Sequence, residues 1–185
     1  MSAAHAGHVD PANKKVALSI AVLALVLAFA ETLGKAAQTS ALANHLEASN
    51  LWAFFQAKTI RQTTIRTAAE QMEAQFGNKA PESVKKQVDA WKKTAERYQS
   101  EPETNEGRKE LMARAKEGEA KRDRAMAAYH HYEIASAAVQ IAIVLASAEI
   151  ITGVAALLWI AYALGAIGVA FGLFGFFWPT AMHLF

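Results

Sequence analysis

The stretch of residues 134–177, IASAAVQIAIVLASAEIITGVAALLWIAYALGAIGVAFGLFGFF, decides the fold of this chain. Glu149 is its only charged side chain. An α-helix rises about 1.5 Å per residue, and about 20 apolar residues are enough to cross the hydrocarbon core of a bilayer. The stretch is therefore too long for one membrane-spanning helix and suits two. Thr152-Gly153 supplies the turn between them, because glycine readily adopts the backbone conformation that ends a helix.

A second apolar segment lies near the N-terminus. Residues 16–30 contain no charged side chain, and Lys14-Lys15 precede them. We expect a transmembrane helix over 14–34 that is retained as an anchor and not removed as a signal peptide. The quoted stretch supplies two more transmembrane helices, over 133–151 and 156–178. The sequence therefore predicts an all-α integral membrane protein with three transmembrane helices.

Charge is concentrated between the first and second of these helices. Seventeen of the 19 Lys and Arg residues lie between Lys35 and Arg124, together with 13 of the 17 acidic residues. This mixture indicates a solvated surface and not the basic patch of a nucleic-acid-binding protein. The chain has no cysteine, which excludes disulfides and thiolate chemistry. It also lacks a phosphate-binding loop, a nucleophile elbow and a zinc-protease motif, so we expect neither an enzyme nor a bound cofactor or metal.

The charged insert, residues 35–132, has the periodicity of helices with two breaks. The breaks are Gly77-Asn78-Lys79-Ala80-Pro81 and residues 100–105. They divide the insert into three expected helices, over about 35–76, 82–99 and 106–132. Each carries apolar residues at alternating steps of three and four, the spacing of a coiled-coil seam. We expect a long, coiled-coil-like helical stalk inserted between the first and second transmembrane helices.

Small residues form a stripe in the third transmembrane helix. They recur at steps of four and three, which keeps them on one face: Ala161, Gly165, Gly168 and Gly172. Such a face lets another helix backbone approach closely. The neighbour is either another helix of the same chain or a second copy, and the sequence leaves both open.

Three polar side chains fall within or beside the transmembrane helices: Glu31, Gln140 and Glu149. Ionisable groups in a bilayer are costly, so an ion or proton role is one hypothesis. The alternative is anchoring at the membrane surface, with Glu31 paired to Lys35 one helical turn later and Glu149 reaching the hairpin. Because the first two spans run in opposite directions, we expect Glu31 and Glu149 at opposite membrane faces.

The histidines give no metal signature. The N-terminal tail, residues 1–13, contains two of them and is expected to be disordered. His130 and His131 are adjacent on a helix, so their rings point about 100° apart and cannot easily share one ion. We expect both to be solvated at the membrane interface beside Tyr129 and Tyr132.

An aromatic cluster interrupts the polar insert within EASNLWAFFQAKTIRQT, residues 47–63. On a helix, one broad face carries the aromatic rings, and Ala53, Ala57 and Ile60 form a narrower apolar face on the other side. Packing within the stalk accounts for one face, and an amphipathic helix on the membrane surface is an alternative. Two apolar faces on one helix indicate contact with neighbours on both sides, which favours an assembly surface. Its candidate residues are Leu51, Trp52, Phe54, Phe55, Lys58 and Ile60.

The aromatic motif is also where the chain resembles a known family. Most of the chain is similar to the bacterial membrane family catalogued as domain of unknown function 4337. The shared features are Asn-Lys-Lys-Val-Ala-Leu from residue 13, Glu-Ala-Ser-Asn from 47, Trp-Ala-Phe-Phe-Gln-Ala-Lys from 52, Ile60-Arg61, His-Tyr-Glu from 131, Gln-Ile-Ala-Ile from 140 and the glycine-rich third span. The hairpin departs from the family, since Glu149, Thr152 and Gly153 stand where relatives commonly carry basic residues. The resemblance implies a fold and a membrane location, and no activity.

These observations favour a membrane-anchored structural or interaction protein, an oligomeric scaffold or an accessory subunit of a larger membrane complex. The alternative is an oligomeric channel or transporter component. The expected partners are the lipid bilayer, further copies of the chain or other membrane-protein subunits, and no nucleic acid. Lys14-Lys15 before the first span places the N-terminus in the cytoplasm and the stalk in the periplasm of the bacterial inner membrane. Lys121, Arg122 and Arg124, beside the second span, favour the opposite orientation.

Overall fold

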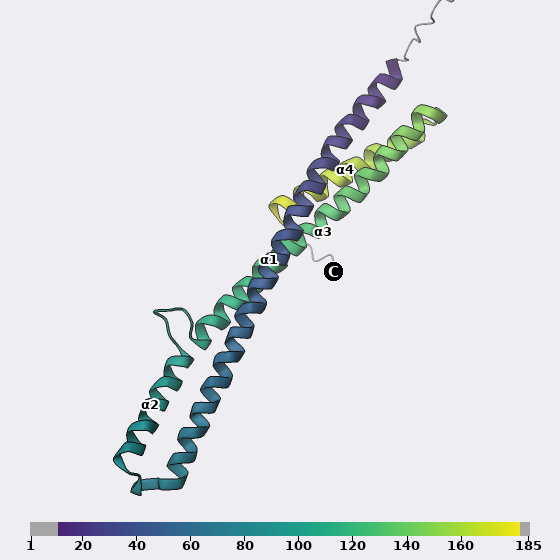
Figure 1. Ribbon diagram of the computed structural model, residues 1–185. Coiled ribbons are helices and arrows are strands. Elements are labelled where there is room, and N and C mark those ends of the chain that lie inside the picture. The colour runs from purple at the N-terminus through teal and green to yellow at the C-terminus, as the bar shows by residue number, and fades with distance from the viewer. Residues whose placement is uncertain (1–10, 182–185) are drawn as a thin grey trace, which may run out of the picture. The chain divides into compact units, whose positions relative to one another are not determined.

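The computed structural model describes residues 11–181, and side chains from residue 14 onward. These residues form four α-helices and one short 3-10 helix, with no strand in the described range (Figure 1). The elements in chain order are α1 (Pro11–Phe76), η1 (Gly77–Lys79), α2 (Glu82–Gln99), α3 (Arg108–Thr152) and α4 (Ala155–Phe177). The prediction of an all-α fold is confirmed.

The helices group into two compact units, which we describe separately. The apolar unit comprises Met1–Ala41 and Asp123–Phe185, of which the structure describes 11–41 and 123–181. The charged unit is Leu42–Arg122. Helices α1 and α3 contribute residues to both units, since neither contains a proline beyond its first position that would break it.

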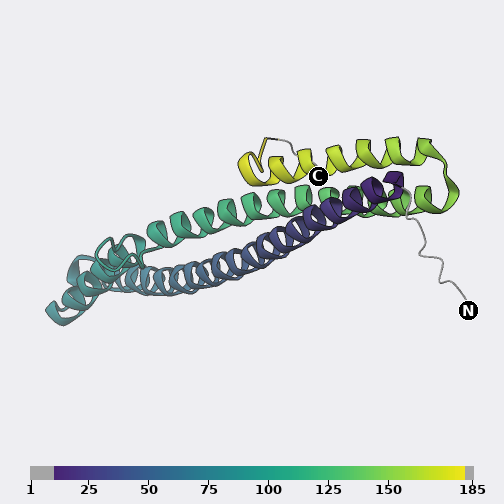
Figure 2. The same cartoon turned by 90° about the horizontal axis from the view of Figure 1, so that it is seen from above.

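The apolar unit consists of α4 and the adjoining parts of α1 and α3, with α3 and α4 side by side (Figure 2). Its core is made of small and branched apolar residues: Val16, Leu23, Val139, Ala142, Ala146 and Ala161. The outward side chains are apolar as well, with Leu18 66%, Phe29 61% and Trp159 73% exposed. By length and composition, α1, α3 and α4 are each capable of crossing a membrane.

A tight turn joins α3 to α4 where the sequence offers Thr152-Gly153. Gly153 has a φ of 69°, a left-handed conformation that glycine adopts without a steric penalty. Its N–H donates to the Glu149 carbonyl at 2.7 Å, which satisfies a carbonyl at the end of α3. The Thr152 hydroxyl accepts a hydrogen bond from the Val154 N–H at 3.4 Å. The turn is therefore built from local hydrogen bonds.

The charged unit packs α2 and the beginning of α3 on one face of α1. Its central cluster contains Leu51 from α1 and Leu111 and Ala115 from α3. Further along α1, Ala69 is buried, as are Val88 and Ala95 of α2. These positions lie in the apolar seams that the three- and four-residue spacing indicates.

Two helix boundaries differ from those expected. Helix α3 begins at Arg108 and not at 106, because residues 100–107 form a turn that side chains hold in place. Residues 11–13, expected in a disordered tail, belong to α1, where proline suits the first position because that residue needs no N–H partner. The rest of the expected tail, residues 1–10, lies outside the described residues.

Candidate functional site

The aromatic motif forms a packing surface inside the charged unit. Leu51 is 7% exposed and contacts Leu111 and Ala115, and the Trp52, Phe54 and Phe55 rings pack against this cluster. Trp52 also donates from Nε1 to Glu119 Oε1 at 2.9 Å. These four α1 residues therefore contact α3 of the same chain.

Lys58 is buried against the turn that precedes α3. It is 6% exposed, and its Nζ lies 3.1 Å from Glu101 Oε2 and 4.0 Å from Glu106 Oε2. The same Nζ lies 5.5 Å from the ring centroids of both Phe54 and Tyr98, within range of a cation–π interaction. These contacts within the chain account for the Lys58 ammonium group, and its expected place in a surface for another chain stays a prediction.

The opposite side of α1 in the charged unit remains open. Ile60 is 66% exposed, and Ala53 and Ala57 are exposed beside it. Leu42 and Leu46 continue the same helical face at 59% and 55% exposure. We call this the α1 outer face: Leu42, Leu46, Ser49, Ala53, Ala57, Ile60, Thr64 and Thr67. It carries no charged side chain.

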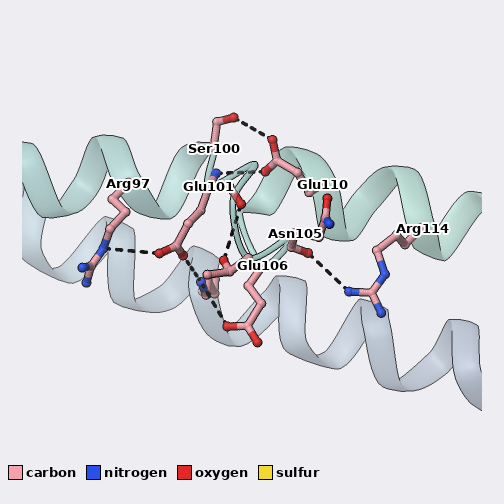
Figure 3. A network of polar contacts seen from close by, with 9 residues as sticks. Arg97, Ser100, Glu101, Asn105, Glu106, Glu110 and Arg114 are labelled. Carbon is pink, nitrogen blue, oxygen red and sulfur yellow. Dashed lines mark hydrogen bonds and ion pairs between the residues drawn. The ribbon is translucent and has the colours of Figure 1, made fainter.

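A polar network holds the turn between α2 and α3 (Figure 3). The Ser100 hydroxyl donates to Glu110 Oε1 at 2.6 Å, and the Glu101 N–H donates to Glu110 Oε2 at 3.2 Å. These bonds, chiefly the one from Ser100, hold the pKa of the Glu110 carboxyl below its ordinary value. Arg114 donates to the carbonyl of Asn105, whose φ is 56°. The network is structural in character, because it satisfies the backbone and side chains of the turn itself.

Sequence reasoning missed a buried polar cluster next to this turn. Gln62 is 2% exposed, and its Nε2 donates to the Ala95 carbonyl at 2.8 Å. Arg108 donates from Nη1 to Gln62 Oε1 and from Nε to Thr59 Oγ1. A buried amide needs such partners. The sequence signal for this cluster was the position of Gln62, which lies three and seven residues before Ile65 and Ala69 and so shares their helical face.

In the apolar unit, the small-residue stripe of α4 packs within the chain. Ala161 is fully buried, and a Cβ added at Gly165 would lie 2.7 Å from Leu23 of α1. One added at Gly168 would clash with Val139 of α3. Gly172 differs, since a Cβ there would meet no atom within 4 Å. Three of the four predicted packing residues thus serve helix contacts in one molecule.

Glu31 and Gln140 meet between α1 and α3. Gln140 Nε2 donates to Glu31 Oε1 at 3.1 Å and contacts Ser136 Oγ at 3.3 Å. Among the described residues no ion pair joins Glu31 to Lys35, so the pairing expected from their spacing is replaced by the bond to Gln140. A carboxylate and an amide from helices distant in sequence are thereby brought together.

The level of this pair follows from the contacts of α4. Gly168 faces Ala135 and Val139, immediately before Gln140, whereas Gly175 faces His131 and Tyr132. Along the helix axes, Gln140 therefore lies beside the middle of α4. The Glu31 carboxylate, which accepts its hydrogen bond, lies close to the same position. The pair lies within the apolar length of the unit, not at its end.

The Glu31–Gln140 pair borders an open recess of about 430 Å³, which we call the Glu31 recess. The small residues Ala30, Gly34 and Ala137 line it, and its polar lining residues come from both helices. The wall residues are Glu31, Lys35, Gln38, Tyr129, Tyr132, Glu133, Ser136 and Gln140. A volume in this range is typical of small-molecule sites.

His131 is not at a solvated interface, contrary to the expectation. It is fully buried, its Nε2 lies 3.1 Å from the Pro179 carbonyl, and its ring packs near Phe171 and Phe174 of α4. The physical reason is the α4 stripe, since Gly175 has no side chain and leaves room for His131. His130 is partly exposed and lies 3.5 Å from Glu133.

Glu149 is half-buried near the hairpin, and its Oε2 is buried without a hydrogen-bond partner. It lies far along α3 from Gln140 and does not line the Glu31 recess. Within residues 14–181 no three His, Cys, Asp or Glu side chains cluster as metal ligands would. The Glu31 recess is therefore the main candidate ligand site, and the α1 outer face is the main candidate contact surface.

Comparisons with known proteins give a family and no activity. No curated protein and no solved structure matches the chain. A family model described as Domain of unknown function (DUF4337) matches residues 12–178, which includes both units and all four helices up to the end of α4. The family expected from the aromatic motif and its flanking residues is confirmed: the chain belongs to the DUF4337 family.

Proposed function

We propose that this protein is a membrane-anchored scaffold that assembles through the α1 outer face. The observation that carries the proposal is an exposed face without charge, with Leu42 59%, Leu46 55% and Ile60 66% exposed. The solvent side of a soluble helix normally carries charged residues. An uncharged and mainly apolar face of this length is typical of a surface that another protein covers.

The anchor is the apolar unit. It has three helices of sufficient length and apolar content, and large outward side chains such as Trp159, 73% exposed, would be costly in water. We place the protein in a bacterial inner membrane, with the N-terminus cytoplasmic because Lys14 and Lys15 precede the first span. The charged unit is then periplasmic.

A second copy of the chain is the partner that fits the outer face best. Copies inserted with one orientation have parallel α1 helices, so each residue of the face can meet its own counterpart. Ala53 and Ala57 allow close approach at the centre, and Leu46 and Ile60 supply apolar area on both sides. The absence of charge means that like residues can meet without repulsion. An accessory role with another membrane subunit would use the same face.

The test introduces a charge on the α1 outer face. The control introduces the same charge elsewhere in the charged unit. Ala57→Glu alters the face, whereas Ala90→Glu alters an exposed position of α2. We expect native mass spectrometry of gently extracted full-length protein to give one defined oligomer for the unmodified chain and for Ala90→Glu. Ala57→Glu should shift the distribution to monomer. A monomeric unmodified protein, or an unchanged oligomer in Ala57→Glu, contradicts the proposal.

A channel or transporter component is the second candidate function. It is favoured by the Glu31–Gln140 pair, level with the apolar middle of α4, where polar groups usually face water or another protein. In proteoliposomes containing the assembled protein, ion flux that is lost in Glu31→Gln and in Glu149→Ala would support this function. Absence of flux in a correctly assembled sample removes it.

A further inference from the structure

We propose that the Glu31 recess binds a primary ammonium group, such as that of an aminophospholipid headgroup or a free amine. The inference rests on the proposed membrane anchoring for the lipid source, and on the geometry of the recess for the ammonium chemistry. It concerns the apolar unit and is independent of assembly through the α1 outer face.

The arrangement of the acceptors supports a ligand that donates hydrogen bonds. Glu31 lines the recess, and its Oε1 accepts one hydrogen bond, from Gln140, so the carboxylate keeps further acceptor capacity. Ser136, whose hydroxyl contacts Gln140, and Glu133, whose carboxylate also lies 3.5 Å from His130, line the same recess and add oxygen acceptors. An ammonium group carries three donors and no acceptor, so it matches these walls.

The net charge of the recess also favours a cationic ligand. Two carboxylates, those of Glu31 and Glu133, and one ammonium, that of Lys35, line the recess, which gives a formal net charge of −1. Near a membrane interior such a charge is costly unless a cation compensates it. A zwitterionic aminophospholipid suits all three groups, because its phosphate can pair with Lys35 while its ammonium pairs with the carboxylates.

The size and the aromatic lining favour an organic cation over a bare metal ion. The recess has about 430 Å³, and the rings of Tyr129 and Tyr132 contribute to its walls. Cations bind to the faces of aromatic rings. Ala30, Gly34 and Ala137 keep the recess open because they have little or no side chain. Gly34 also allows α1 to approach Tyr132, since a Cβ at this position would lie 3.3 Å from the Tyr132 Cβ.

The experiment measures lipid binding to full-length, delipidated protein in detergent by native mass spectrometry. The probes are phosphatidylethanolamine, which carries the ammonium, and phosphatidylglycerol, which does not. A parallel titration uses free ethanolamine. We expect phosphatidylethanolamine to bind at least about tenfold more tightly than phosphatidylglycerol, the ratio that a charge-assisted hydrogen bond provides. Binding of free ethanolamine with the same variant dependence would identify a soluble amine as a second source.

Three variants make the test specific. Glu31→Gln should abolish the preference for phosphatidylethanolamine, and Ala137→Leu should weaken binding by filling the recess with its charges intact. Glu70→Gln, at an exposed position of α1 in the charged unit, should leave the preference unchanged. Circular dichroism checks that each variant keeps its helix content. Equal binding of the two lipids, or a preference retained in both Glu31→Gln and Ala137→Leu, overturns the inference.

Flotation of the unmodified protein with liposomes separates this inference from the proposed function. If the protein does not float, the proposed membrane anchoring is wrong, and the ethanolamine titration still tests the recess. If the protein floats and shows neither the lipid preference nor ethanolamine binding, only the ammonium inference fails.

Discussion

Lys58 is a charged side chain that the charged unit keeps almost entirely from solvent. Its ammonium group pairs with Glu101 and lies over the rings of Phe54 and Tyr98. A buried ion pair adds little over apolar packing, but removal of one partner leaves the other unsatisfied. Lys58 therefore contributes to the stability of the charged unit through its contacts with the turn between α2 and α3.

We predict that Lys58→Ala destabilises the charged unit by about 1–3 kcal/mol, because it leaves the Glu101 carboxylate without its buried partner. Native-state hydrogen exchange of the full chain measures the free energy of opening. Lys92→Ala is the control, since the Lys92–Glu73 pair is about half exposed on both sides and should contribute little. Equal effects of the two substitutions would show that the burial of Lys58 has no energetic importance.

The lowered pKa of the Glu110 carboxyl predicts that the stability of the charged unit depends on pH. Its folded pKa is lowered, mainly by the Ser100 hydroxyl, from the ordinary value of 4.5. A lowered folded pKa means that the stabilisation is present above the unfolded pKa and is lost as the pH falls through the folded pKa. We expect Glu110→Gln to be less stable than the unmodified protein at pH 7, with a difference that shrinks on acidification below about 4.5. Urea unfolding across pH 3–7 measures it, and a constant difference contradicts the prediction.

At the scale of elements, the contacts of α4 distinguish its glycines. Gly168 faces Val139 and the Ala135 carbonyl, whereas Gly172 faces open space. The sequence spacing makes the two equivalent, because both lie on one helical face. Their difference arises from the crossing of α3 and α4, which brings the backbones close at Gly168.

We predict that Gly168→Ala lowers the stability of the apolar unit by about 1–3 kcal/mol, because the added methyl group overpacks the contact with α3. Gly172→Ala should leave stability unchanged, since its Cβ meets nothing within 4 Å. The midpoint of thermal unfolding in detergent, followed by circular dichroism, compares the two. An equal decrease in both variants would mean that Gly172 is packed against a further chain or helix.

At the scale of the whole molecule, the prediction concerns orientation in the membrane. The chain contains no cysteine, so a single introduced thiol reports its own side of the bilayer. Gln87→Cys lies at an exposed position of α2, and Val154→Cys lies in the turn before α4, where Val154 is 49% exposed. With a cytoplasmic N-terminus, a membrane-impermeant maleimide should label Cys at 87 in cells with a permeable outer membrane. It should not label Cys at 154 until the inner membrane is opened, and the reverse pattern would invert the orientation.

The chain's helices could be predicted from sequence because their signals are local. Apolar run length indicates three helices able to span a membrane, and Pro81 and Gly153 mark ends that depend on backbone conformation alone. The DUF4337 family followed from a contiguous aromatic motif. Helix α3 begins at Arg108, two residues after the expected position of about 106, and side chains from α1, including Lys58, help to hold the preceding turn.

The candidate site was predictable only in its residue types. Glu31, Gln140 and the small residues of α4 stand out in the sequence because they are polar or small within apolar helices. Only the tertiary structure joins Glu31 to Gln140, buries His131 opposite Gly175 and separates Gly168 from Gly172. Helical periodicity determines which side chains share a face, whereas helix crossing determines which faces touch. The sequence alone therefore determined the elements and their apolar faces, and the packing of the helices decided which side chains are buried, paired or exposed.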